Sequence, residues 1–230
     1  MAERRIVAFG GFTFGDEDHR GLEKELLRLT GKERPRVCFL PTASADDAGY
    51  TVIFYEAFSG RADPTHVVFH PWPPEDLRAR IVGSDLVYVG GGNTANMLAI
   101  WRVHGVDGML REAWEAGSIL CGSSAGMICW FEAGVTDSFG PQLRGMRDGL
   151  GFLLGSACPH YDAEELRRPR YHELVREGFP AGYAAEDGVG LVFHGTQFAE
   201  AVSGAAGKRG YRVELRDGEL VETPIEARVL

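Results

Sequence analysis

The amino-acid sequence predicts an α/β fold: a three-layer, doubly wound and mostly parallel sheet with antiparallel strands added near the C-terminus. Short, almost continuously apolar runs alternate with amphipathic segments through the first half of the chain, as expected of strands covered on both faces. In such a sheet the ligand site lies beyond the carboxyl ends of the strands. The length of 230 residues suits one core, so we expect a single domain over residues 1–230.

The first half of the chain alternates predicted strands and helices in a regular order. The strands, rich in valine, isoleucine, leucine and phenylalanine, are expected at 5–9, 37–40, 65–69, 86–89 and 119–121. The helices between them are expected at 20–29, 48–58, 74–81 and 95–116, the last interrupted at Gly105. The apolar run 127–131 after the fifth strand is interpreted as the start of another helix.

The pattern changes after Ser156. A helix is predicted over 164–177, and short strands follow at 189–193, 197–202, 211–215 and 219–222. Asp217-Gly218 separates the last two strands and is typical of a tight hairpin turn. We therefore expect these strands to extend the same sheet in mixed or antiparallel directions.

Composition and charge exclude several classes of function. The net charge of -9 argues against nucleic-acid partners, which need a basic surface. The longest stretch without a charge, 116–131, is too short to span a membrane, and the N-terminus lacks the pattern of a secretory signal, so we expect a cytoplasmic protein without membrane partners. The four cysteines show no metal-type spacing, so we expect neither a metal site nor a disulfide.

The most informative motif is Gly122-Ser123-Ser124-Ala125-Gly126, which follows a predicted buried strand. Small residues on both sides of a serine allow the sharp strand-to-helix turn that exposes a nucleophilic hydroxyl, the nucleophile elbow. Glycines at 122 and 126 relieve the crowding that this turn creates. The alternative interpretation is a glycine-rich loop with an incidental serine.

A second glycine-rich turn, Gly90-Gly91-Gly92-Asn93-Thr94, also follows a predicted strand and opens a helix. Its backbone N–H groups suit an oxyanion or a carboxylate, so Gly91 or Gly92 together with Ala125 could complete an oxyanion hole. The alternative is a structural or phosphate-binding turn. Neither this turn nor 10–15 has the spacing of a dinucleotide fingerprint, so we expect no nicotinamide cofactor.

The candidate general base is His160 in Cys158-Pro159-His160-Tyr161, downstream of the serine and just past a strand end expected after the apolar run 152–154. An imidazole placed there can accept the serine proton and return it to the leaving group. The acid that orients this ring must lie within hydrogen-bond reach. Asp137 is preferred because it stands in a polar loop after the elbow helix and preserves the order serine, acid, histidine; Glu132, closer to the helix end, is the alternative acid, and Asp162 is also nearby.

The three motifs at 89–94, 122–126 and 158–161, in this order and spacing, resemble the peptidase E family of serine peptidases, which includes cyanophycinase. The resemblance implies a fold like that of the class I glutamine amidotransferases, with serine in place of their cysteine. It further implies hydrolysis of dipeptides with an N-terminal aspartate, no cofactor, and small peptides as partners. It is consistent with a homodimer.

The resemblance also implies roles for particular residues. Ser124 would be the nucleophile and His160 the base, with Asn93 and Arg170 as substrate-binding residues. Arg170 is the best positional match to the family's arginine, whose guanidinium would bind the substrate aspartate. Other specificities stay open at this point: a carboxypeptidase-like or other small-peptide preference, an esterase, or a non-catalytic relative that binds anions.

Overall fold

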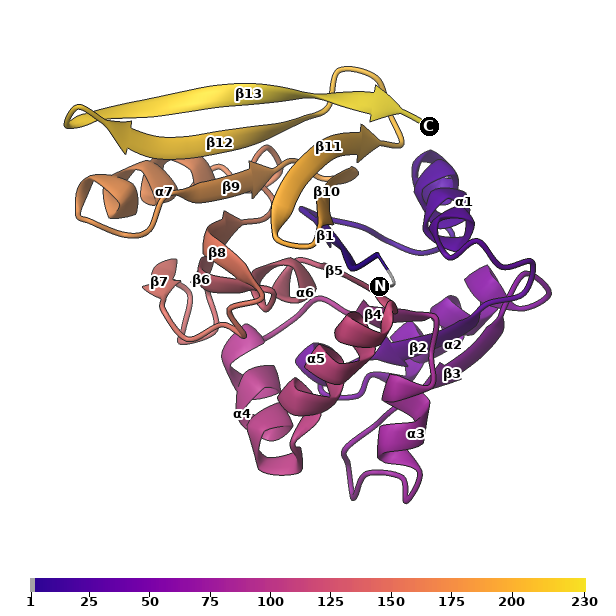
Figure 1. Cartoon of the computed structure of the whole chain (residues 1–230). Coiled ribbons are helices and arrows are strands. Elements are labelled where there is room, and N and C mark those ends of the chain that lie inside the picture. Colours follow the sequence, from indigo (N-terminus) through magenta and orange to yellow (C-terminus); the bar gives the residue numbers. More distant parts are fainter. Residues whose placement is uncertain (1–2) are drawn as a thin grey trace.

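The computed structural model describes residues 3–230, and their strands form one sheet of mixed direction. The sheet has 13 strands in the described part of the chain, in the order β3-β2-β4-β5-β1-β10-β11-β13-β12-β9-β8-β6-β7. Mostly parallel strands with antiparallel strands toward the C-terminus are what the sequence predicts, so the predicted fold class is confirmed (Figure 1).

The first five strands are parallel and carry the helical crossovers. They are β1 (Arg5–Phe9), β2 (Arg36–Leu40), β3 (Asp63–His66), β4 (Leu86–Val89) and β5 (Ile119–Ser123). The helices that follow them are α1 (Arg20–Leu29), α2 (Ala48–Phe58), α3 (Leu77–Val82), α4 (Thr94–His104) and α5 (Val106–Ala116), with short 3-10 turns at Glu17–His19 and Thr42–Ser44. β3 begins and ends earlier than the predicted strand 65–69. The apolar residues Val67 and Phe69 that suggested a strand there instead pack into the core just beyond it.

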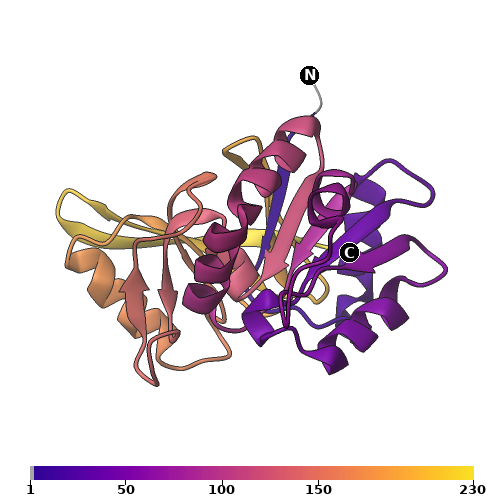
Figure 2. The ribbon, with the colours of Figure 1, turned by 90° about the horizontal axis from the view of Figure 1, so that it is seen from below.

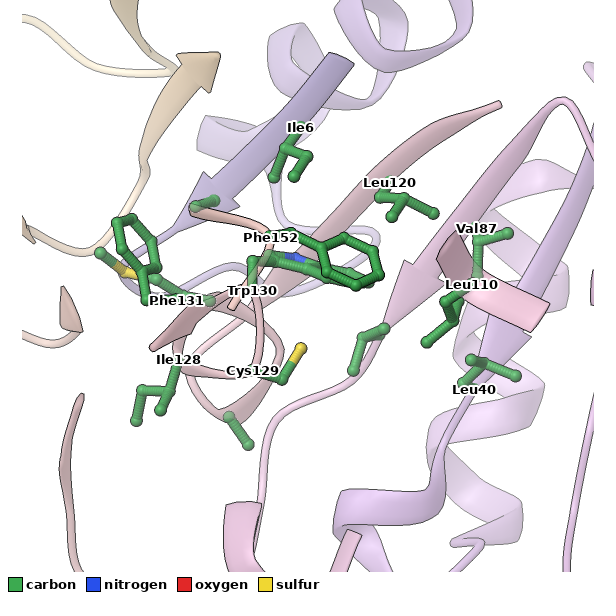
Figure 3. Packing of buried hydrophobic residues seen from close by; sticks show 14 of the residues in the cluster. Ile6, Leu40, Val87, Leu110, Leu120, Ile128, Cys129, Trp130, Phe131 and Phe152 are labelled. Carbon is green, nitrogen blue, oxygen red and sulfur yellow. The ribbon is translucent and has the colours of Figure 1, made fainter. Parts of the chain in front are cut away.

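Alternating strand residues supply two separate cores, which gives the three layers. On β1, Val7 and Phe9 belong to the cluster covered by α1 and α2, whereas Ile6 and Ala8 belong to the cluster covered by α3, α4 and α5. Figure 3 shows part of the cluster covered by α3, α4 and α5, which includes Trp130 and Phe152. The centroids of these two rings are 5.8 Å apart. A parallel sheet buried on both faces follows from these two patterns.

The second part of the sheet begins where a helix was expected. The helix α6 (Ala125–Ile128) is a single turn, and Phe131 already starts β6 (Phe131–Thr136), so the interpretation of 127–131 as a helix is wrong beyond Ile128. Phe131 packs edge-on against Phe193 and is fully buried, which favours an extended backbone that enters the next strand.

The remaining elements form the other end of the sheet, beside the parallel part in Figure 2. They are β7 (Arg144–Met146), β8 (Leu153–Cys158), α7 (Arg167–Arg176), β9 (Gly182–Ala185), β10 (Val189–His194), β11 (Gln197–Ser203), β12 (Arg209–Arg216) and β13 (Glu219–Val229). β6, β8 and β9 are parallel to one another, which places the residues after β8 and β9 at the same edge of the sheet.

The predicted hairpin turn is present and connects unusually long strands. Asp217 and Gly218 have φ of 54° and 85°, the two positive values that a type I′ turn requires. β13 continues well past the predicted end at 222, because it first pairs along β12 and then joins β11 in parallel. This strand connects the two parts of the sheet (Figure 1).

Two further expectations concern the cysteines and the membrane. All four cysteines are buried and free, and burial raises the pKa of the Cys38 and Cys158 thiols to about 12. They therefore behave as small apolar residues. Among the helices of residues 3–230, the structure contains none with the length and apolar character needed to cross a bilayer.

Candidate active site

Ser124 occupies a sharp turn between β5 and α6. Its backbone has φ 56° and ψ -108°, a conformation that costs free energy in a residue with a Cβ. The turn is tight because its neighbours nearly touch: a Cβ on Gly126 would stand 2.3 Å from the Val89 carbonyl oxygen, and one on Gly122 would stand 2.7 Å from that of Gly126. These contacts explain why only glycine fits on either side, and the geometry is that of a nucleophile elbow.

His160 follows β8 and also has a positive φ, of 53°. Its Nδ1 lies 2.7 Å from Oδ1 of Asp187. Because a carboxylate only accepts hydrogen bonds, Nδ1 carries the proton and donates it. Nε2 is then left with its lone pair, which is the form that a general base needs.

Asp187 is held in place by its surroundings. Its backbone N–H donates to Oδ1 of Asp162 at 2.9 Å, and Asp162 forms an ion pair with Lys208. Burial alone would raise the pKa of Asp162, but the hydrogen bonds from Lys208 and from the Asp187 N–H outweigh it and lower the pKa. Asp162 is therefore a charged anchor for the backbone that carries Asp187.

Gly11, after β1, packs directly against the Asp187 carboxylate. A Cβ on Gly11 would stand 2.2 Å from Oδ1 of Asp187, which is far inside van der Waals contact. The N–H of Gly188 donates to the Gly11 carbonyl oxygen at 2.8 Å. The end of β1 therefore forms one wall of the Asp187 site.

Ser124, His160 and Asp187 line one pocket of about 280 Å³. Its other lining residues are Gly11, Phe12, Thr13, His19, Tyr50, Gly91, Gly92 and Ser123. A Cβ on Gly91 would stand 3.8 Å from Oγ of Ser124, so the predicted glycine turn lies beside the hydroxyl. Burial raises the pKa of Tyr50, so its hydroxyl stays protonated and can donate to a ligand.

The structure therefore places Ser124, His160, Gly91 and Gly92, four of the residues singled out in the sequence, in one pocket. Ala125 begins α6 directly after the serine, and the first N–H groups of a helix have no partner within the helix. Its N–H group is thus available near the hydroxyl.

The acid predicted for His160 is wrong, because the ring is bonded to Asp187. Asp137 is exposed and heads a turn in which its carbonyl oxygen accepts from the N–H of Gly140. Glu132, the alternative, accepts a hydrogen bond from the N–H of Gly155 at 2.8 Å. Neither residue lines the pocket that contains Ser124.

The two predicted substrate-binding residues lie outside this pocket as well. Asn93 caps α4, where its Oδ1 accepts from the N–H of Asn96, and its Nδ2 donates to the carbonyl oxygen of Ser138. Arg170 donates to the carbonyl oxygen of Leu143 and to Glu173. It lines a different pocket, between α7 and residues 141–144.

Asp187 was not predicted from the sequence because the strand before it lacks a clear strand pattern. β9 is only Gly182-Tyr183-Ala184-Ala185, which lacks the β-branched residues that are enriched in strands. The signal that could have found it is the pair Glu186-Asp187 followed by Gly188, an acidic loop between two strands. Pairing of β8 with β9 then carries it to the edge where His160 lies.

Gly11→Ala should displace the Asp187 carboxylate without touching Ser124. The new Cβ must displace the Asp187 carboxylate from His160, and we expect kcat to fall at least about 100-fold, as for other misplaced catalytic groups. Steady-state kinetics on a cleaved peptide would measure this. Gly108→Ala is the matched control, because the exposed Gly108 in α5 has no atom near its Cβ position; an equal loss in both variants would contradict the packing argument.

A doubly wound α/β sheet whose pocket combines a strained serine with an imidazole–carboxylate pair has the features of a serine-type hydrolase. Comparison with known families agrees with this class. Residues 6–201 match the model of Peptidase family S51, and the chain belongs to this family. It is therefore a peptidase, as the sequence motifs predict.

One relative supports the assignment, and two solved structures share the fold. The chain is 45% identical over 230 residues to "Uncharacterized peptidase YgaJ" of Bacillus subtilis (strain 168), with 99% of each chain covered. Its fold is similar to the crystal structure of a peptidase from an acI-B1 Actinobacterium, with a TM-score of 0.68, 15% identity, and coverage of 98% of this chain and 95% of that one. A putative peptidase E protein from Listeria monocytogenes EGD-e gives a TM-score of 0.64 at 19% identity, covering 88% and 99%.

Proposed function

We propose that the protein is a serine peptidase that hydrolyses short peptides, with Ser124, His160 and Asp187 as its catalytic triad. The observation that carries the proposal is the 2.7 Å contact from His160 to Asp187 in the pocket that also contains the strained Ser124. Membership of Peptidase family S51 supports the reaction class.

The mechanism is acyl transfer. Oγ of Ser124 attacks the carbonyl carbon of the scissile peptide bond while Nε2 of His160 takes the hydroxyl proton. The imidazolium gives that proton to the leaving amine, and the acyl group remains bonded to Oγ. Water, deprotonated by His160, then releases the acid and restores the serine. Asp187 holds the ring in the correct tautomer and stabilises its positive charge.

The oxyanion hole consists of backbone N–H groups on two sides of Ser124. The glycine turn at Gly91 and Gly92 lies on one side, and the N–H of Ala125 lies on the other. Such donors, fixed where negative charge develops, contribute about 2.7–4 kcal/mol each to transition-state stabilisation.

Dipeptides with an N-terminal aspartate are the proposed substrates. The pocket of about 280 Å³ lies at the lower end of the range for ligand sites, which favours a short peptide over an unfolded chain. The resemblance of the three motifs to peptidase E favours aspartate at the N-terminal position.

Covalent labelling tests the nucleophile directly. We expect a fluorophosphonate probe to modify Ser124 and not the neighbouring Ser123, which is 3% exposed, with peptide mapping as the measurement. A panel of dipeptides and a chromogenic ester, assayed on the same sample, assigns the reaction. Labelling with ester turnover but no peptide cleavage would indicate an esterase, and absence of labelling would remove the proposed mechanism.

A further inference from the structure

The pocket around Ser124 has few groups that can bind an anion. Among the described residues that line it there is no lysine or arginine, and its acidic member is Asp187. The basic side chains are His160 and His19. Since His160 is engaged with Asp187, His19 is the remaining lining side chain that can carry a positive charge toward a ligand.

His19 is fixed on one side of its ring. Nδ1 lies 3.1 Å from N and 3.2 Å from O of Thr13, and the ring stacks on Phe12 with centroids 5.3 Å apart. Nε2 makes no hydrogen bond to the described residues and borders Gly188, where a Cβ would stand 3.2 Å from it. The His19 ring is therefore fixed in position at the pocket wall, and its Nε2 is suited to contact a ligand.

We propose that protonated His19 binds a carboxylate of the peptide substrate and thereby determines specificity. The inference rests on the proposed peptidase function. An imidazolium donates from both nitrogens, so Nδ1 donates to the Thr13 carbonyl oxygen, 3.2 Å away, in place of accepting from the Thr13 N–H, while Nε2 donates to the carboxylate. A dipeptide with N-terminal aspartate offers two such groups, the aspartate side chain and the C-terminal carboxylate, and the chemistry of recognition is the same for both.

The charged groups near His19 in the sequence and across the pocket are mostly acidic. On its own segment the charged neighbours are Asp16, Glu17, Asp18 and Arg20. Across the pocket are Asp187, the His160 ring and the buried hydroxyl of Tyr50, whose raised pKa keeps it neutral. A substrate carboxylate that enters beside Asp187 is repelled unless a cation lies close, and His19 is placed to supply it.

The test compares kcat/KM for three peptides, Asp-Leu, Asn-Leu and Asp-Leu amide, across the range in which histidine titrates, roughly pH 8 to 5. Ionisation of His160 slows all three alike, so it cancels in a ratio. We expect the ratio of Asp-Leu to Asn-Leu to rise about tenfold as the pH falls, in line with a charge-assisted hydrogen bond. If the C-terminal carboxylate is the bound group, the ratio of Asp-Leu to its amide rises instead.

In His19→Gln the rising ratio should become flat, because the amide carries no charge. His194→Gln is the matched control, since His194 pairs with Glu3 at the far end of β1 and should behave as wild type. Two flat ratios in the wild type, a rise that persists in His19→Gln, or its loss in Arg170→Ala would each overturn the inference. Failure of the proposed function looks different, because none of the three peptides would then be cleaved in a manner that depends on Ser124.

Discussion

Replacing Ser124 with alanine will abolish peptide hydrolysis, with kcat falling on the order of 10⁶-fold, as expected when the nucleophile of a triad is removed. The expected loss is this large because no other hydroxyl stands at the strained turn between β5 and α6; Ser123 is buried in the strand. Steady-state kinetics with the best dipeptide of the panel measures it. A residual rate within tenfold of wild type would contradict the assignment.

Stability measurements separate this effect from misfolding. Ser124→Ala keeps a Cβ at φ 56°, so the free energy of unfolding should change little. Ser124→Gly removes the Cβ and with it the cost of the positive φ, and should raise the free energy of unfolding by about 1 kcal/mol while it is equally inactive. An inactive but stabilised variant is the behaviour of a residue that is strained for function.

Much of this site is predictable from the sequence because several of its residues directly follow strands with a clear apolar pattern. β4 and β5 are buried, near-continuous apolar runs, so the turns at Gly91 and Ser124 are expected at the same edge of a parallel sheet. His160 is found because it follows the apolar run Phe152-Leu153-Leu154 and lies downstream of the serine. In each case the local pattern and the fold agree, and only short-range information is needed.

The acid is different because its position depends on pairing between distant strands. Asp137 follows Ser124 at a plausible separation, but β6 leaves it exposed on a turn. Asp187 reaches His160 only through the parallel pairing of β8 with β9 and the close approach of Gly11 from β1. These contacts join three segments that are far apart in the chain. The apolar periodicity within one segment does not predict which other segments it will contact.

The sequence is equally limited in predicting the cation that would bind a substrate carboxylate. Arg170 is a good candidate by its position after the histidine, yet its guanidinium bonds to Leu143 and Glu173 in another pocket. His19, more than a hundred residues before His160 in the sequence, lines the pocket because the turn after β1 folds back over the strand ends. Whether Arg170 or His19 enters the pocket depends on the direction of its side chain, and tertiary packing sets that direction.

The second large effect expected is that of Asp187→Asn, with kcat falling about 10³ to 10⁴-fold, as for the loss of the orienting acid in other triads. An amide in this place donates its own N–H to Nδ1 of His160, so the ring's proton moves to Nε2. A ring with its proton on Nε2 cannot accept the proton of Ser124. The side chains are nearly equal in volume, so the contact with Gly11 and the free energy of unfolding should be preserved.

Asp137→Asn and Glu132→Gln are the matched controls for this prediction, since they make the same chemical change at the two acids that sequence reasoning favoured. Both side chains are exposed, and we expect kcat within about twofold of wild type, as for surface substitutions that touch no catalytic group. Kinetics of the three variants at one pH decides between the acids. If Asp137→Asn were the damaging change and Asp187→Asn nearly silent, the contact between His160 and Asp187 would have no catalytic role, and the triad would need a conformation in which the ring turns toward the loop after β6.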